Sequence, residues 1–209
     1  MTQPAPIAVS RALSPEDQAR ADCYAVLARL YADPPDAAFL AMLGAAPRLT
    51  AGDGDAGLTD AWNRLLDASL VMDADAAKQE YDDLFVGVGR SEANLHGSHW
   101  RTGFMMEKPL AELRGELSQL GIARKGAATM VEDHLAALCE TMRLLISGSA
   151  EFRSVPLDVQ RNFFEKHLLP WIFDCCAAID QCSLANYYRR VAEFTCQFMA
   201  VERDSLVMD

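Results

Sequence analysis

Apolar residues recur every three or four positions along most of the sequence, which is the spacing of helices that bury one face. No stretch alternates apolar and polar residues for long enough to predict a β-strand. Prolines, glycines and capping residues divide the pattern into helices expected at about residues 14–32, 39–43, 59–70, 74–85, 110–120, 129–146, 156–172 and 184–203. The pattern therefore predicts an all-α fold.

Local signals predict where several of these helices begin, break and end. Ser14, followed by a proline, is typical of a helix start, and Thr59 or Asp60 can cap the third helix. Gly121 is expected just past the end of its helix, where a left-handed residue closes the last turn. Pro170 lacks an N–H group, so it should kink or break the segment around it.

Residues 86–102 lack helical periodicity and contain glycines, serines and two histidines. We expect an irregular loop that lies over the helices, and loops of this length in compact domains usually serve a function. Residues 44–57, which are rich in alanine, glycine and aspartate, are predicted to form a surface loop.

The chain of 209 residues is long enough for one domain, which we expect at residues 14–205 as a helical bundle. Residues 1–13 are expected to be a flexible N-terminus and residues 206–209 a C-terminal tail. No apolar run reaches the length of a membrane span, and the first eleven residues lack the features of a signal or transit peptide. These observations predict a cytoplasmic protein without stable membrane insertion.

Charge narrows the classes of partner. Nineteen lysines and arginines against thirty aspartates and glutamates give a net charge of −11, which repels nucleic acid and anionic lipid. The same charge favours a basic peptide. The six cysteines include no C-x-x-C pair, so we interpret them as reduced thiols buried among helices rather than as zinc ligands.

The segment Glu132-Asp133-His134 is the first candidate site. If Thr129 caps the helix, Glu132 completes a capping box in the first turn. His134 then lies on or beside the buried face. It is either a hydrogen-bonded core residue or a histidine of a binding site.

Glu80, Asp82 and Asp83 place negative charge at the end of a helix, where the helix dipole disfavours it. Such a run marks either a site for a cation or a solvated face.

Little in the sequence indicates an enzyme. His96 and His99 share one segment, but two histidines do not complete a zinc site, and Ser98 is not in a G-x-S-x-G elbow. We therefore predict no catalytic residue, no metal site and no cofactor. Two alternatives stay open: a helical adaptor that binds a folded partner protein, and a metal-dependent hydrolase that uses His96, His99 and His134.

Three ordered motifs carry a resemblance to a known family. They are E-Y-x-x-L-F-x-G at residues 80–87, E-D-H-L at residues 132–135 and F-F-x-x-H-L-x-P-W at residues 163–171. Ser98 and Trp100 match the serine and aromatic residue that end the loop after the first motif. In this order the motifs resemble the TorD/DmsD/NarJ family of cytoplasmic chaperones that mature molybdoenzymes, over about residues 16–203.

The resemblance implies a single all-helical domain of the TorD-like type and a protein that is not an enzyme. It implies binding of the twin-arginine signal peptide, or of the N-terminal region, of an apo-molybdoenzyme subunit while the molybdopterin cofactor is inserted, before export or assembly. It also implies a possible homodimer by domain swapping, with the loop before Glu132 as the hinge.

Matched position by position, the resemblance implies peptide binding by seven residues: Leu84, Phe85, Gly87, Ser98, Trp100, Asp133 and His134. One departure concerns residues 88–93, which contain none of the prolines usual in this loop of the family. In this respect the chain resembles family members associated with formate dehydrogenases, so the resemblance implies a formate dehydrogenase as the client.

Overall fold

The structure, a computed structural model, describes residues 13–50, 52, 55–86, 93–123 and 130–208. In these ranges no residue belongs to a strand, and the one β-type contact is an isolated antiparallel bridge between His96 and His134. The predicted all-α fold is thereby confirmed. The elements are, in order, α1 (Pro15–Ala32), α2 (Ala37–Gly44), α3 (Ala56–Val71), α4 (Ala74–Tyr81), a π-helix η1 (Asp82–Val86), α5 (Gly97–Thr102), α6 (Lys108–Gln119), α7 (Leu135–Ser147), α8 (Leu157–His167), α9 (Ile172–Gln181) and α10 (Tyr187–Met208).

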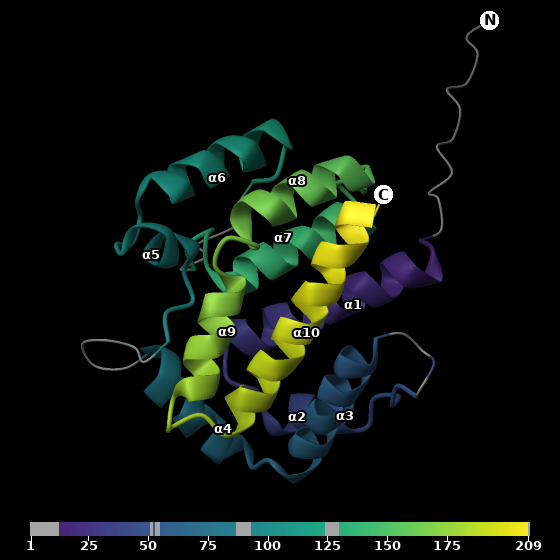
Figure 1. Cartoon of the computed structure of the whole chain (residues 1–209), viewed down its shortest axis with the longest axis vertical. Coiled ribbons are helices and arrows are strands. Elements are labelled where there is room, and N and C mark those ends of the chain that lie inside the picture. The colour runs from purple at the N-terminus through teal and green to yellow at the C-terminus, as the bar shows by residue number, and fades with distance from the viewer. Residues whose placement is uncertain (1–12, 51, 53–54, 87–92, 124–129, 209) are drawn as a thin grey trace, which may run out of the picture.

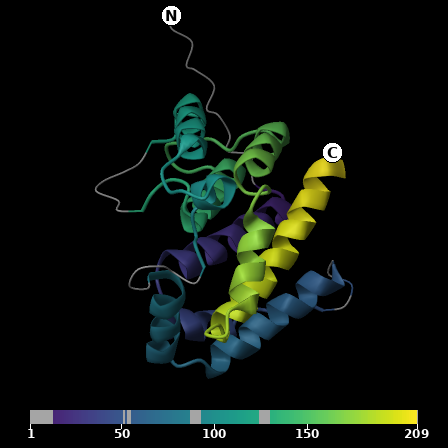
Figure 2. The same cartoon turned by 60° about the vertical axis from the view of Figure 1, so that its left-hand side comes forward.

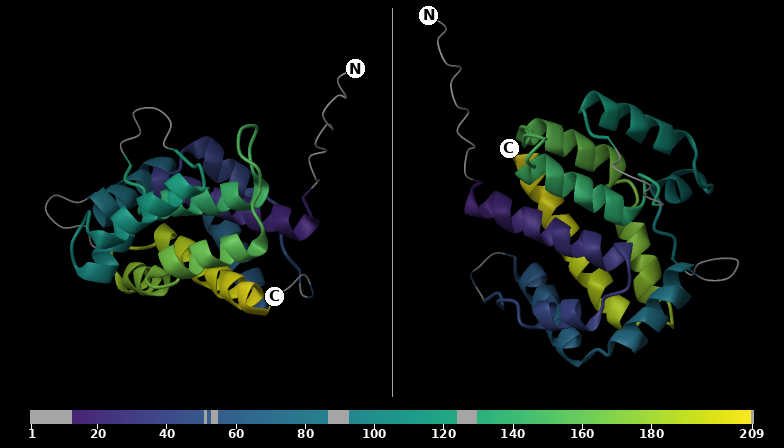
Figure 3. Two further views of the ribbon diagram at one scale, coloured as in Figure 1. Left: turned by 90° about the horizontal axis from the view of Figure 1, so that it is seen from above. Right: turned by 180° about the vertical axis from the view of Figure 1, so that it is seen from behind.

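The long helix α10 lies across one face of the bundle, with α3 and α9 packed against it (Figure 1). Helices α1 and α7 pack side by side on the other face, as the view from behind in Figure 3 shows. Helices α5 and α6 contact each other at the end of the molecule opposite α2, α3 and α4 (Figures 1 and 2). The segment from α5 to α7 contains the motif at residues 132–135, together with Ser98 and Trp100.

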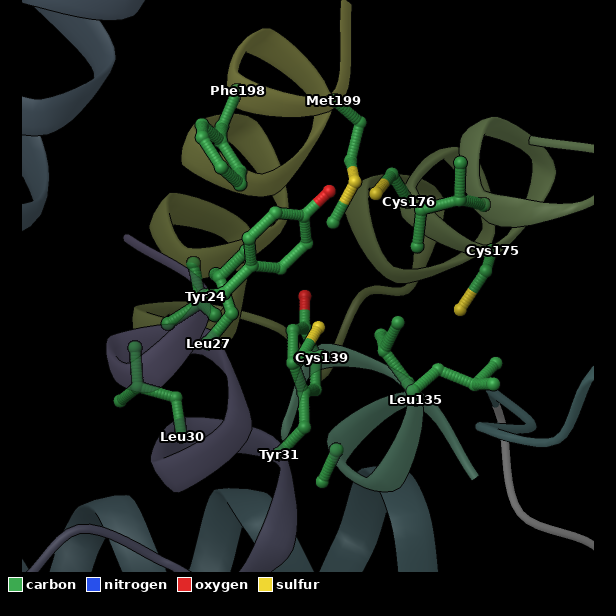
Figure 4. Packing of buried hydrophobic residues seen from close by; sticks show 14 of the residues in the cluster. Tyr24, Leu27, Leu30, Tyr31, Leu135, Cys139, Cys175, Cys176, Phe198 and Met199 are labelled. Carbon is green, nitrogen blue, oxygen red and sulfur yellow. The ribbon is translucent and has the colours of Figure 1, made fainter. Parts of the chain in front are cut away.

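The core is built where α1, α7, α9 and α10 meet (Figure 4). Helix α1 contributes two fully buried tyrosines, and α10 contributes an aromatic and a methionine side chain. Burial of such side chains is the main favourable contribution to folding. The buried residues shown there include Tyr24, Leu27, Leu30, Tyr31, Leu135, Cys139, Cys175, Cys176, Phe198 and Met199.

Cysteines are confirmed as free thiols, and Cys139, Cys175 and Cys176 are buried. Burial raises the pKa of Cys175 to about 12, because the apolar surroundings disfavour the thiolate. Such thiols behave as small hydrophobic side chains.

Aspartate and serine side chains begin the first four helices. The Ser14 hydroxyl accepts from the N–H of Asp17, as expected for the predicted helix start. The third helix begins earlier than predicted: Asp55, not Thr59 or Asp60, is its N-cap and accepts from the N–H of Leu58. Asp36 and Asp73 cap α2 and α4 in the same way.

Two predicted interruptions are confirmed. Gly121 has a φ of 73°, and the N–H of Ile122 bonds to the backbone oxygen of Leu117 (2.8 Å), which is the closing bond of a Schellman motif. Pro170 lies between α8 and α9, so the segment is broken and not merely kinked.

Other boundaries differ from the prediction. The expected loop at residues 86–102 contains the short helix α5, and α7 begins at Leu135 rather than at residue 129. Thr129 lies outside the described residues, and Glu132 precedes the helix, so it does not act in a capping box at the third helical position. Helix α10 continues through Leu206 to Met208, because Leu206 is buried against the bundle.

A buried ion pair ties α1 to α10. The Arg20 guanidinium donates to both carboxylate oxygens of Glu202 (2.6 and 3.1 Å), and the Tyr24 hydroxyl donates to the second of them (3.0 Å). Burial alone lowers the pKa of Arg20, but the hydrogen bond and charge of Glu202 outweigh it, so this pKa is raised above its ordinary value. The contact between α1 and α10 therefore stabilises the charged form of Arg20.

Candidate functional site

Residues 95–98, at the start of α5, meet residues 131–136, at the start of α7. The N–H of Gly97 donates to the backbone oxygen of Asp133 (2.9 Å), and a second backbone bond beside it completes the antiparallel bridge. We call these two segments the junction. It contains the second motif of the sequence and part of the segment that follows the first.

Asp133 holds the junction through its side chain. Its Oδ2 accepts from both the backbone N–H (2.9 Å) and the hydroxyl of Ser98. Asp133 is 4% exposed and Ser98 is fully buried. Because the first N–H groups of a helix lack partners within it, the carboxylate satisfies one of them for α5. Its other oxygen, Oδ1, is buried and has no hydrogen-bond partner in the described part of the chain.

His134 is the N-cap of α7, and its Nδ1 accepts from the N–H of Ala136 (3.2 Å). Its ring packs edge-on against the ring of His96, with centroids 4.9 Å apart. Burial, reinforced by the neighbouring His96, lowers the pKa of His134 to about 4, and the charge of Asp133 offsets this only in part. Burial also lowers the pKa of His96. Both rings are therefore neutral at neutral pH.

This burial predicts a loss of stability on mild acidification. Between pH 6.5 and about 4 the unfolded chain takes up a proton at His134 that the folded chain does not, so the free energy of unfolding falls as the pH falls. Urea unfolding at pH 7 and pH 5 measures this slope. His134→Gln should reduce the slope, and an unchanged slope in that variant would show that another group causes the loss.

The third motif supplies a wall of the junction. The Trp171 side chain is buried, and its indole N–H donates to the backbone oxygen of His167 (2.7 Å), which fixes the ring. A Cβ at Gly97 would lie 3.0 Å from Nε1 of this ring, closer than side chains normally approach. Gly97 therefore allows α5 to begin directly against Trp171.

Replacing Gly97 with alanine should lower the free energy of unfolding by about 1–3 kcal/mol, because the fixed indole cannot move without opening the core. Gly115→Ala is the matched control, since a Cβ there has no described atom within 4 Å. On an exposed helix that control should stabilise the protein by about 0.5–1 kcal/mol. Chemical denaturation of both variants measures the difference. Equal stabilities would refute the proposed close contact.

The first motif joins three helices. Glu80 accepts from the backbone N–H groups of Asn186 (2.8 Å), Tyr187 (3.0 Å) and Tyr188 (2.7 Å), so it caps the start of α10. The Tyr81 hydroxyl donates to backbone oxygens at the end of α1, each at 3.1 Å. Glu80 is therefore neither a cation site nor a solvated residue. It satisfies the N-terminus of a helix.

His167 of the third motif fastens α6 to α8. Its Nε2 lies 3.0 Å from Oε2 of Glu116, which also accepts from Lys166 (2.7 Å). Burial alone would raise the pKa of Glu116, but the hydrogen bonds from these two neighbours lower it overall.

The seven predicted binding residues do not form one cluster. Leu84 is buried, and Phe85 is half-buried against the rings of Tyr31, Tyr81 and Tyr188. The indole N–H of Trp100, on α5, donates to the backbone oxygen of Asn94 (2.7 Å). Gly87 lies outside the described residues. The remaining three, Ser98, Asp133 and His134, meet at the junction.

A groove of about 490 Å³ lies between α1 and α7, beside the junction. The motifs did not reveal it, because its floor is made of alanines. The available signal was the spacing of Ala25, Ala28 and Ala32, which places small residues on one face of α1. We call it the α1–α7 groove; its lining residues are Ala25, Ala28, Arg29, Ala32, Leu117, Ile122, Ala123, Met130, Glu132, Ala136, Ala137, Glu140 and Thr141.

No group of three or more His, Cys, Asp or Glu side chains in the described ranges could hold a metal ion. His96 packs edge-on against His134, whereas the ring of His99 packs against Trp100. Of the three histidines of the hydrolase alternative, two are therefore in contact with each other and the third makes a different contact.

The structure is a helical bundle in which residues of the three motifs connect segments that are distant in sequence. The family model described as nitrate reductase delta subunit matches residues 52–177, more than half of the chain. The chain belongs to this family, which comprises NarJ/TorD-like chaperones for the maturation of molybdoenzymes and not catalytic enzymes. The family assignment made from the motifs is thereby confirmed. A comparison with curated proteins gave no match.

Within the described ranges, no helix combines the length and apolar character needed to cross a lipid bilayer.

Proposed function

We propose that the protein is a cytoplasmic chaperone that binds the twin-arginine signal peptide, or the N-terminal region, of a molybdoenzyme catalytic subunit. Binding would hold the subunit while molybdopterin is inserted, before export or assembly. The observation that carries the proposal is the groove beside the junction, where Glu132, from a motif of the family, and Glu140 lie among mostly apolar lining residues. A peptide with basic residues followed by an apolar run needs carboxylates beside an apolar surface.

The seven residues named from the motifs stay the proposed peptide-binding set, with two different roles. Phe85 and Trp100 are half-buried and can contact a peptide directly. Leu84, Ser98, Asp133 and His134 are buried, so they would act by holding the surrounding segments in place, and Gly87 lies outside the described residues. A formate dehydrogenase as client and a homodimer are parts of the same proposal.

Isothermal titration calorimetry with synthetic leader peptides tests this function. A peptide from a molybdoenzyme subunit, with two arginines and its apolar run, should bind, and replacing both arginines with glutamine should weaken binding. Added salt should weaken it as well, because exposed charges are screened. If no leader of a molybdopterin-dependent enzyme binds the wild-type chain, the proposed function is wrong.

The helical adaptor is a second candidate, and one surface favours it. The turn between α5 and α6 exposes three consecutive apolar side chains, of which Phe104 and Met106 are each 69% exposed. Flexible methionine-rich surfaces suit adaptable protein contacts. A pull-down with a client that lacks its N-terminal segment distinguishes the two functions. Only a helical adaptor should still bind the truncated client.

A further inference from the structure

We propose that the exposed face of α2 is a docking surface for a basic amphipathic helix carried by another protein. The face consists of the exposed residues Ala37, Ala38, Ala41 and Met42, and we call it the α2 face. It lies at the end of the molecule opposite α6 (Figure 1). The proposal concerns a second partner, so it does not depend on binding of a leader peptide.

Helix α2 has the composition of a buried helix, yet one side of it faces solvent. Its eight residues include no charged or hydrogen-bonding side chain, and its buried residues are Leu40 and Leu43. A helix that is apolar on every side is normally enclosed by protein, whereas a surface helix carries polar residues on its outer side. The α2 face therefore lacks the polar side chains of a solvated surface.

Large apolar side chains enlarge the α2 face. Met42 is 56% exposed, and at the end of α3 Leu70 is 59% and Val71 85% exposed. A Cβ at Gly44 would lie 2.7 Å from the Leu70 side chain, so Leu70 lies directly beside α2. Exposed apolar residues that adjoin one another are typical of a site where another protein binds.

The sequence around the α2 face is strongly acidic. Residues 33–83 contain eleven acidic and three basic residues, which gives −8 of the chain's net charge of −11. Each of the three basic residues forms an ion pair: Arg48 with Asp67, Arg64 with Glu193 and Lys78 with Asp82. The excess of negative charge is therefore not neutralised within this segment.

Two carboxylates beside the α2 face can accept a cation from a partner. Asp73 and Asp75 follow Val71 in the sequence, and neither forms an ion pair with another described residue. Asp75 is exposed, so a lysine or arginine can pair with it without displacing a cation of the protein. Two copies of this surface would instead bring like charges together, and anionic lipid would be repelled. Charge therefore favours a basic partner protein.

The shape of the α2 face favours a helix as the occupant. The face is the outer side of a helix, and the short side chains of Ala37, Ala38 and Ala41 allow another helix to approach closely. Side-chain ridges of one helix pack into the grooves of another. The partner helix needs an apolar stripe to cover Met42 and Leu70, with lysines or arginines beside that stripe to reach the carboxylates.

A synthetic peptide of leucine and lysine, with the leucines on one face of a helix, is the probe. It should bind the chain in fluorescence anisotropy. A peptide of the same composition with scattered leucines should bind at least about tenfold more weakly, and a peptide of leucine and glutamate should not bind. The first comparison tests the apolar stripe, and the second tests the charge.

Two methionine variants locate the binding. Met42→Lys places a positive charge on the α2 face and should weaken binding of the leucine–lysine peptide by at least about tenfold. Met106→Lys is the matched control, because it introduces the same charge at an exposed methionine between α5 and α6, and it should bind like the wild type. Equal binding by the two variants would refute the proposal.

The acidic side is tested separately. Asp75→Asn should weaken binding of the same peptide about two- to fivefold, as expected for one exposed ion pair. Asp158→Asn, which removes an exposed carboxylate at the start of α8, should leave the affinity unchanged.

A measurement on the wild-type chain covers the case in which Met42→Lys does not fold. In methyl NMR of labelled methionines, the leucine–lysine peptide should shift the resonance of Met42 and spare that of Met106. If the peptide does not bind, or binds without shifting Met42, the α2 face is not a docking surface for a basic helix. A wild-type dimer in sedimentation velocity that Met42→Lys dissociates would also refute the proposal, because a second copy would then cover the face. Each of these failures leaves the proposed function intact.

Discussion

Replacing Arg20 with alanine is expected to lower the free energy of unfolding by about 3–5 kcal/mol. The substitution leaves the Glu202 carboxylate, 1% exposed, without its bidentate partner, and the Tyr24 hydroxyl is then its one donor among the residues that the structure describes. A buried charge without a partner costs far more than the net contribution of the intact pair. Guanidinium chloride unfolding at neutral pH measures the loss as a shift of the midpoint.

Two further variants make this result specific. Arg203→Ala breaks the exposed pair with the adjacent Asp204 and the contact of the guanidinium with the Phe173 ring, and we expect a loss below about 1 kcal/mol. Arg20→Met combined with Glu202→Leu removes both charges from the contact and should recover much of the stability lost in Arg20→Ala. A double variant as unstable as the single variant would show that packing of the Arg20 side chain, rather than the isolated charge of Glu202, causes the loss.

The spacing of apolar residues predicted most of the helices. Each helix must bury one apolar face in the core, and this requirement does not depend on which helix it packs against. Helix α5 was not predicted. It has only six residues, and it is held by Asp133 from a segment 35 residues away. The predicted start of α7 was wrong for a related reason, since the junction holds Glu132 and Asp133 in a turn before the helix begins. Long-range contacts decide both elements, and a local pattern does not contain them.

The motifs identified the family correctly. Their residues, however, mainly hold segments of the fold together, whereas their composition indicated a binding surface. The acidic and imidazole groups that predicted a binding surface are largely buried, and they connect segments distant in sequence: Asp133 with Ser98, and His167 with Glu116. Alanines make up much of the described lining of the groove between α1 and α7, so the signal for it in the sequence was a row of small residues on α1. The type of a residue in the sequence can indicate its chemistry. A groove between two helices cannot be predicted in this way, because it forms only when the helices pack together.

Replacing Glu80 with alanine should lower the free energy of unfolding by about 3 kcal/mol. The carboxylate accepts from three backbone N–H groups at the start of α10, and those of Tyr187 and Tyr188 belong to buried residues. Each buried donor left without an acceptor costs about 1–3 kcal/mol. The negative charge also favours this end of the helix dipole. For a chain of this length, the expected fall in melting temperature is about 6–12 °C.

The adjacent carboxylates of the same motif provide the comparison. Asp83 is exposed, and in the described part of the chain it accepts from the Gln79 side chain alone, so Asp83→Ala should stay within about 0.5 kcal/mol of the wild type. Glu80→Gln keeps one acceptor oxygen and should fall between the wild type and Glu80→Ala. Differential scanning calorimetry ranks the three variants. If Glu80→Ala and Asp83→Ala have the same melting temperature, the capping role of Glu80 is wrong. The start of α10 would then be stabilised by the hydrogen bonds from the Tyr81 and Tyr188 hydroxyls to the end of α1 instead.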